Sequence, residues 1–445
     1  MKWSETIIDI FKTIQNNEIA SRFTKVFSVD VLVKGSTFLL LPVYLHLMTQ
    51  EDVGTFNYLF VFVQTLSILL SFGLNSAQSK LYHDYKGVER RQLLFSINLL
   101  LLAFFAIVLV PACAFGLDVR LINFVFEHPI PYPLYRFPLL LSLITTVGSN
   151  LLLNYLLTSE KIRKVQIYNL LRLFISNGFV IAILFFSKGD KVLIRLTTYY
   201  LCEALLWICF FVGYVKQFRF ALDWAKTKKI FSICFPLFLL SLVSTVLSFS
   251  DKFFVQQKTD MSVMAVYTTG ITIAAVCSLI IMSFQNIWLP IFLKEKNVEI
   301  NFRRTNKMAK LIAVSFTGIA IFMIIGVKVA LILDIIPSSY GDVLKILPFL
   351  FVSQIILAVN VLYGNYFLYF GRMTLGSLVG GSIYVVSFFL NFILIPRYGV
   401  SGAVGALSIN SVLMLTTVYL VVNYLYRNQK KSIYERTDYS IVVSE

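Results

Sequence analysis

The sequence predicts an all-α polytopic membrane protein with about twelve transmembrane helices. Of its 445 residues, 58% are hydrophobic and only 14% are charged, whereas soluble domains are close to half apolar and a quarter charged. Apolar segments of about twenty residues recur along nearly the whole chain, and a helix of that length crosses the hydrocarbon core of a bilayer. These two observations exclude a soluble globular protein.

Hydropathy places the individual spans. We expect transmembrane helices near 26–48, 54–74, 93–113, 138–157, 165–186, 199–215, 231–250, 264–290, 309–333, 343–363, 375–395 and 400–423. An even number of spans puts both termini on the same side of the membrane.

The distribution of basic residues sets the orientation. The net charge of +16 would suggest nucleic-acid binding in a soluble protein, but in a membrane protein Lys and Arg accumulate in cytoplasmic loops. With both termini in the cytoplasm, the inside loops contain most of the cations, among them Lys80, Lys86, Arg90, Arg91, Lys161, Arg163, Lys164 and the basic residues of 216–230. No nucleic-acid partner is expected. The outer loop 187–198 departs from the rule, and we expect its Lys188, Lys191 and Arg195 to contact anionic material outside.

Neither a metal site nor an enzyme active site is indicated by the sequence. The five cysteines lie within or at the end of apolar segments, and the three histidines are scattered, so we expect no disulfide framework, metal or cofactor. The longest predicted outer loop, 114–137, is too short for a soluble catalytic domain. This argues against a membrane polymerase or glycosyltransferase.

A weak internal repeat suggests the domain organisation. Near 44–56, and again near 251–267, the chain ends a span, crosses a short polar turn and enters the next span through an aromatic residue. Because both halves start on the same side, the repeat is parallel, as in transporters that hold substrate between two halves. The predicted domains are an amphipathic cytoplasmic segment 1–25, a six-helix bundle 26–215, a cytoplasmic linker 216–230, a second six-helix bundle 231–423 and a cytoplasmic tail 424–445.

Polar residues recur at helical spacing in the first two spans of each half. The stripe of span 54–74 comprises Asn57, Gln64, Ser67, Ser71, Asn75 and Gln78, and that of span 231–250 comprises Ser241, Ser244, Thr245, Ser248 and Asp251. One interpretation is a hydrated cavity lined by these faces. The alternative is that the Ser and Thr hydroxyls pack helices and bond backbone carbonyls.

Charged residues within spans are the other candidates. Lys34 lies about 12 Å along the first span and Arg172 about 10 Å into the fifth, where a central charge costs about 2.5–3.5 kcal/mol and usually has a function or a partner. The alternatives are snorkelling to the near surface, or a structural pair between Asp30 and Lys34. Glu203, Asp251 and Lys252 are expected near the outer ends of their spans.

These arguments yield two predicted sets of site residues. The substrate-binding cavity is predicted to contain Lys34, Arg172, Lys252, Asn57, Gln64, Ser71, Asn75, Ser244 and Ser248. The coupling or gating candidates are Asp30, Asp251 and Glu203.

Several short motifs support a family resemblance. The segment 391–403 reads Asn-Phe-Ile-Leu-Ile-Pro-Arg-Tyr-Gly-Val-Ser-Gly-Ala, in which a helix ends at Pro, a sharp turn follows, and small residues open the next helix. Together with Lys-Gly-Ser-Thr-Phe-Leu-Leu-Leu-Pro at 34–42, Glu-Asp-Val-Gly at 51–54 and Ser-Asp-Lys-Phe at 250–253, it resembles the bacterial polysaccharide-repeat flippases. That family is part of the multidrug/oligosaccharidyl-lipid/polysaccharide exporter superfamily, and the resemblance covers nearly the whole chain.

The resemblance implies a fold and a substrate. The family has two six-helix bundles in a V shape, alternating access and a cationic central cavity. Lys34, Asp251 and Lys252 lie on matching motifs, whereas Arg172 is chosen on residue arguments alone. The implied function is to move an undecaprenyl-pyrophosphate-linked oligosaccharide from the cytoplasmic to the periplasmic face of the bacterial inner membrane. The product would supply O-antigen of lipopolysaccharide, or capsule, with the polysaccharide polymerase machinery and membrane lipid as partners.

The energy source and two other functions stay open. No G-x-x-x-x-G-K-[ST] loop is present, so this chain is not expected to hydrolyse ATP. The membrane potential, about 2.3 kcal/mol per charge per 100 mV, or coupled proton or sodium influx at Asp30, Glu203 or Asp251, is the expected drive. The nearest alternative function is an ion-coupled multidrug exporter, although Lys34 would repel cationic drugs. A structural scaffold would leave the polar stripes without a purpose.

Overall fold

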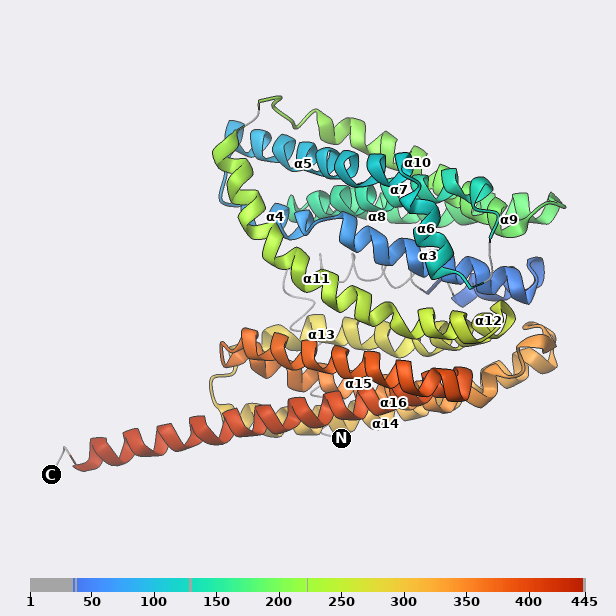
Figure 1. Cartoon of the computed structure of the whole chain (residues 1–445). Coiled ribbons are helices and arrows are strands. Elements are labelled where there is room, and N and C mark those ends of the chain that lie inside the picture. The colour runs from blue at the N-terminus through green and yellow to red at the C-terminus, as the bar shows by residue number, and fades with distance from the viewer. Residues whose placement is uncertain (1–34, 37, 128–129, 222, 443–445) are drawn as a thin grey trace. The chain divides into compact units, whose positions relative to one another are not determined.

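A computed structural model describes residues 35–442 apart from 37, 128, 129 and 222 (Figure 1). Every regular element in this described part is helical, and ten of its helices are long and apolar enough to cross a membrane. The predicted all-α membrane fold is confirmed. Contacts divide the chain into two compact units, Met1–Thr245 and Val246–Glu445, with the division inside α11 (Trp224–Lys258). The domain boundaries expected from the sequence stay a prediction.

The first unit contains the predicted spans of the first half in order; the expected segment 1–25 and the start of the span 26–48 lie outside the described residues. After a short apolar helix, Phe38–Leu47, follow α3 (Gln50–Leu70), α4 (Leu74–Leu81), α5 (Gly87–Ala114), α6 (Leu117–Val125), α7 (Tyr132–Thr158), α8 (Ile162–Leu171), the π-helical turn η1 (Arg172–Ser176), α9 (Asn177–Phe186), α10 (Lys191–Val215) and the first part of α11. Helix α7 packs against α3, α4, α8 and α10 and forms the centre of this unit.

The helix expected at 54–74 is interrupted. Helix α3 ends at Leu70, Phe72 and Gly73 both have positive φ (49° and 70°), and α4 begins at Leu74. Such a φ suits glycine but strains phenylalanine, and the Phe72 ring is held 4.7 Å from each of the Phe104 and Phe238 rings. The break turns the chain, so residues on either side do not share one continuous helix face.

The basic residues of the outer loop contact the protein itself. Helix α10 begins at Lys191, because Asp190 accepts a hydrogen bond from the amide of Leu193 at 3.0 Å. The Lys191 ammonium donates to the carbonyl of Leu47, and the Arg195 guanidinium lies 3.7 Å from the ring centres of both Tyr44 and Phe56. Cation–π contacts of this kind stabilise a cation within the protein. These protein contacts account for two of the three basic residues of the loop, and Lys188 is exposed. The expected contact with anionic material outside stays a prediction.

The second unit is arranged around α15. It contains the end of α11, then α12 (Met261–Ala274), α13 (Val276–Lys294), α14 (Val298–Ile332), the short 3₁₀ turn η2 (Ser338–Tyr340), α15 (Val343–Tyr369) and α16 (Met373–Val442). Helix α15 contacts α12, α13, α14 and α16, as Figure 1 shows for its long neighbour α16. The span expected at 264–290 corresponds to α12 and α13 together.

The turn predicted within 391–403 lies inside α16. Gly399 has φ 57° and ψ −134°, which breaks the helix between the two predicted spans. A Cβ at Gly402 would lie 2.2 Å from the carbonyl oxygen of Leu394, so only glycine permits this approach. The Asn391 side chain donates to the Ser250 hydroxyl at 2.9 Å. Two segments that carry the family resemblance therefore meet within the second unit.

Candidate functional site

The structure does not describe two of the predicted residues. Asp30 and Lys34 lie outside the described residues, so their roles in coupling and in the cavity stay predictions. The other predicted residues are described, and they are considered in turn, unit by unit.

Arg172 and Glu203 form an ion pair in the first unit. Arg172 Nε lies 2.8 Å from Glu203 Oε2, and the carboxylate side chain is fully buried whereas the Arg172 side chain is 26% exposed. Arg172 opens the π-helical turn η1, a local distortion that often accompanies functional sites. The turn places the guanidinium toward α10, where it also donates to the Tyr199 hydroxyl at 3.3 Å.

The same carboxylate has a second partner. The buried Tyr168 hydroxyl lies 2.9 Å from Glu203 Oε1, to which it donates, and 2.9 Å from the Ser149 hydroxyl. Ser149, Tyr168, Arg172, Tyr199 and Glu203, from α7, α8, η1 and α10, are called the Arg172 cluster below. A buried charge is tolerated when it is paired and hydrogen-bonded, and the cluster supplies both conditions for Glu203.

The expected depth of Glu203 was wrong. The sequence suggested a position near the outer end of a span at 199–215, but α10 runs from Lys191 to Val215, and Glu203 is twelve residues from each end. Helix α10 begins earlier than expected because its first turns contain Lys191 and Arg195, whose charges are held by contacts with the protein. Glu203 is therefore at the middle of its helix, about 18 Å from either end.

The polar stripe of the second span is divided by the break after α3. Asn57 and Gln64 are half-buried on α3, whereas Asn75 and Gln78 belong to α4. Ser71, at the end of α3, donates to the carbonyl of Ile68 at 2.7 Å. The expectation of one shared helix face is therefore wrong, and Ser71 makes the carbonyl bond that the alternative interpretation describes.

A polar network around Gln78 was not predicted. Buried Gln78 donates to the Tyr214 hydroxyl at 2.9 Å and accepts from Asn154 at 2.7 Å. Asn98 donates to the same Tyr214 hydroxyl at 3.0 Å. Asn98 and Asn154 are amides within apolar segments, and that polarity is the sequence signal that marks them.

In the second unit, Asp251 and Lys252 form a similar arrangement. Lys252 Nζ lies 2.8 Å from Asp251 Oδ2, which also accepts from the Tyr267 hydroxyl at 2.8 Å. The Asp251 and Lys252 side chains are 8% and 21% exposed. Helix α11 continues to Lys258, so Asp251 lies about two turns inside the helix end rather than at it. Each unit thus contains a buried carboxylate with one cation and one tyrosine.

The serine stripe of α11 has mixed environments. Ser244 is half-buried and donates to the carbonyl of Ser241 at 3.2 Å, whereas Ser248 is exposed. Further polar pairs that the sequence did not single out lie between α13 and α15: Gln285 with Asn365 in a reciprocal amide pair, and Ser278 with Gln354 at 2.6 Å.

The fold is similar to solved transporter structures. The lipid II flippase MurJ in an inward closed conformation is 16% identical with a TM-score of 0.60, and the match covers 88% of this chain and 87% of that chain. An inward-facing multidrug resistance MATE family transporter of the MOP superfamily is 14% identical with a TM-score of 0.67, covering 90% and 99%. A MOP superfamily transporter from Pyrococcus furiosus is 15% identical with a TM-score of 0.62, covering 92% and 96%. At these identities the likeness concerns the fold.

Comparison of the sequence with known protein families identifies the family of this chain. No curated protein matches the chain. Residues 23–296, more than half of the chain, match the family model described as polysaccharide biosynthesis protein. The resemblance drawn from the sequence motifs is confirmed, and the chain belongs to the polysaccharide biosynthesis protein family.

Proposed function

We propose that this protein is a flippase for a lipid-linked oligosaccharide. The observation that carries the proposal is that a polysaccharide biosynthesis family model matches a chain built almost wholly from membrane-spanning helices. In the described part of the chain the connections between helices are too short to fold into a catalytic domain. Such a protein is suited to moving an intermediate rather than synthesising it, and we infer that it is not an enzyme. The fold likeness to a lipid II flippase supports a role in moving the intermediate.

The proposed substrate is an undecaprenyl-pyrophosphate-linked repeat unit. It would move from the cytoplasmic to the periplasmic face of the bacterial inner membrane, for O-antigen or capsular polysaccharide, with both termini of the protein in the cytoplasm. Lys34, Arg172 and Lys252 would neutralise the pyrophosphate, since charge-assisted hydrogen bonds to phosphate are strong. The amides and hydroxyls of the cavity would bind sugars; these are Asn57, Gln64, Ser71, Asn75, Ser244 and Ser248.

The paired carboxylates suggest how turnover could be coupled. While Glu203 is ionised it holds Arg172, and protonation would remove the charge that competes with a pyrophosphate for the guanidinium. Asp251 stands in the same relation to Lys252. We propose that proton binding at either carboxylate, with sodium as the alternative ion, releases the cation to the substrate. The membrane potential would add a drive for an anionic headgroup.

The experiment is a gene deletion followed by mass spectrometry of membrane lipids. The proposal predicts accumulation of an undecaprenyl-pyrophosphate oligosaccharide of one complete repeat, with loss of surface polysaccharide. Complementation with the wild-type gene should reverse both effects. Unchanged lipids together with unchanged surface polysaccharide would reject the proposal.

A second candidate is an ion-coupled multidrug exporter. The observation that favours it is the TM-score of 0.67 to a MATE family transporter. It predicts that the deletion strain becomes sensitive to cationic drugs and accumulates no lipid-linked oligosaccharide.

A further inference from the structure

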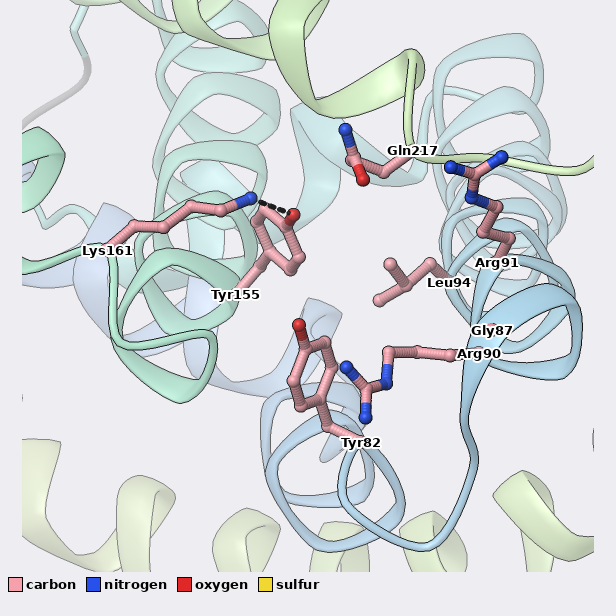
Figure 2. A pocket seen from close by; sticks show the side chains of 8 residues that line it. All are labelled: Tyr82, Gly87, Arg90, Arg91, Leu94, Tyr155, Lys161 and Gln217. Atoms are coloured by element: carbon pink, nitrogen blue, oxygen red, sulfur yellow. Dashed lines mark hydrogen bonds between the residues drawn. The ribbon is translucent and has the colours of Figure 1, made fainter.

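A pocket of about 210 Å³ lies at one end of the first unit (Figure 2). It is formed where the loop after α4, the start of α5, the end of α7, the turn before α8 and the segment after α10 converge. These connections are the ones predicted to face the cytoplasm. None of the residues assigned to the substrate cavity or to coupling lines it.

Three cations and two aromatic rings shape this pocket. Figure 2 shows Lys161 on one side and Arg90 and Arg91 on the other, with the rings of Tyr82 and Tyr155 between them. The Arg90 guanidinium lies 4.3 Å from the centre of the Tyr82 ring, and its Nε donates to the carbonyl of Tyr85 at 2.9 Å. Lys161 donates to the Tyr155 hydroxyl and lies 4.6 Å from the centre of that ring. Two of the cations are therefore held in place by neutral groups.

The charges of the pocket are not neutralised within it. No carboxylate is among its lining residues. Glu89 and Glu160, which adjoin Arg90 and Lys161 in sequence, are exposed, and Asp84 and Asp223 are paired with Lys229 at 3.6 Å and Lys226 at 3.1 Å. Among the described residues, the Arg91 side chain has neither an ion-pair nor a hydrogen-bond partner. Its guanidinium is the group best placed to accept a new anionic partner.

Two helix N-termini add to the positive potential. Helix α5 begins at Gly87, which lines the pocket, and α8 begins at Ile162, directly after Lys161. In both helices the N-cap residue makes no side-chain hydrogen bond to the first turn. Unsatisfied amides and the helix dipole at such ends favour anions, phosphate above all.

We propose that this pocket binds a phosphate or diphosphate group. Arg side chains and helix N-termini both suit tetrahedral oxyanions, and Arg can bind them in a bidentate manner. The volume of about 210 Å³ is several times the ~30 Å³ that one water occupies in the liquid, which leaves room for two linked phosphates. The group could belong to the lipid-linked substrate, to a membrane phospholipid or to free pyrophosphate. The site is additional to the cavity proposed above and does not depend on the transport function.

The test is isothermal titration of the purified full chain with inorganic pyrophosphate, in nanodiscs of phosphatidylcholine. We expect saturable binding by the wild type that weakens as salt is raised. Arg91→Gln should weaken it about tenfold, the effect of losing one hydrogen bond to a charged group, and Arg91→Lys should retain most of it. Lys80→Gln is the matched control, because Lys80 is an exposed cation that does not line the pocket. The Lys80→Gln variant should bind pyrophosphate with the affinity of the wild type.

Two further arms identify the source of the phosphate. Nanodiscs that contain phosphatidylglycerol should compete with pyrophosphate if a phospholipid headgroup occupies the pocket, and nanodiscs that contain undecaprenyl pyrophosphate should compete if the carrier lipid does. Competition by neither leaves free pyrophosphate as the ligand. Equal binding by the wild type and Arg91→Gln, at equal thermal stability, would overturn the proposal, and so would binding by none of the three phosphate sources.

Discussion

At the scale of single residues, the central feature is a buried carboxylate held by two neighbours. Glu203 has no exposed side-chain surface and contacts Arg172 at 2.8 Å and the Tyr168 hydroxyl at 2.9 Å. In such a site the charge of either partner depends on the other, because an unpaired charge in a low-dielectric interior is strongly disfavoured. A proton that binds Glu203, or an anionic substrate that binds Arg172, can therefore break the ion pair.

The first prediction concerns the energetics of this pair. Arg172→Gln leaves Glu203 buried without its cation and should destabilise the protein by about 3 kcal/mol. Arg172→Gln combined with Glu203→Gln removes both charges and should recover most of that loss, since neutral partners can bond each other. Thermal unfolding of the purified variants in detergent measures both effects. A double variant no more stable than Arg172→Gln would show that the two charges do not depend on each other.

The second prediction separates stability from transport at the same pair. The double variant should insert in the membrane at the wild-type level, yet it should fail to restore surface polysaccharide to a deletion strain, because no cation is left for the pyrophosphate. Lys191→Gln is a suitable control, as its side chain bonds a backbone carbonyl outside the Arg172 cluster. Full complementation by the double variant would assign Arg172 a purely structural role.

At the scale of helices, the main features are the points at which a helix is interrupted. The chain turns at Phe72 and Gly73 in the first unit and at Gly399 in the second, each through positive φ. After Gly399 the helix restarts so close to the preceding turn that Gly402 meets the carbonyl of Leu394. This turn also lies beside the residue that follows α11, since a Cβ at Gly399 would lie 3.6 Å from the Thr259 side chain.

The third prediction tests the turn within α16. Gly402→Ala puts a methyl group 2.2 Å from the Leu394 carbonyl oxygen and should destabilise the second unit by at least about 1–3 kcal/mol, the usual range for overpacking. Gly405→Ala is the matched control, because nothing lies within 4 Å of its Cβ and alanine favours a helix. Size-exclusion profiles and thermal unfolding should show loss for the first and none for the second. Equal behaviour would argue against the close approach at Gly402.

Sequence patterns predicted the helices better than their interruptions. Apolar segments of membrane length are a strong signal, so the spans from α3 to α16 overlap the expected ones although several of their ends differ. The break at Phe72 was not predictable, because a positive φ at phenylalanine results from ring packing with Phe104 and Phe238, which are distant in sequence. The start of α10 was misplaced for a related reason: Arg195 looks like a loop residue until the rings of Tyr44 and Phe56 are beside it.

The candidate site was predictable in its members but not in its pairing. Arg172 and Glu203 were both selected as charges within spans, yet their contact depends on the π-helical turn and on the true length of α10. Gln78 was placed on a cavity stripe, whereas it bonds Asn154 and Tyr214 inside the first unit. Such tertiary partners have no local sequence pattern.

At the scale of the whole molecule, two compact units carry related chemistry. Each contains a buried carboxylate, a cation and a tyrosine within bonding distance: Glu203, Arg172 and Tyr168 in the first unit and Asp251, Lys252 and Tyr267 in the second. The proposed orientation in the membrane follows from the distribution of Lys and Arg between the loops on the two sides.

The fourth prediction concerns that orientation. A fluorescent protein that matures only in the cytoplasm should be bright when fused after Glu445 and dark when fused after Lys188, because most basic residues are in the loops assigned to the inside. Alkaline phosphatase fused at the same two positions should show the opposite pattern. A bright fusion after Lys188 would place that loop in the cytoplasm and invert the proposed direction of transport.

Reconstituted translocation tests the central claim most directly. Proteoliposomes containing undecaprenyl-pyrophosphate oligosaccharide from a deletion strain would be sampled for headgroups newly accessible to an external glycosidase. The account predicts that wild-type protein raises the accessible fraction well above that of empty liposomes, and that Lys34→Ala and Arg172→Gln/Glu203→Gln do not. No increase with wild-type protein, while the same vesicles transport a cationic drug, would contradict the flippase assignment.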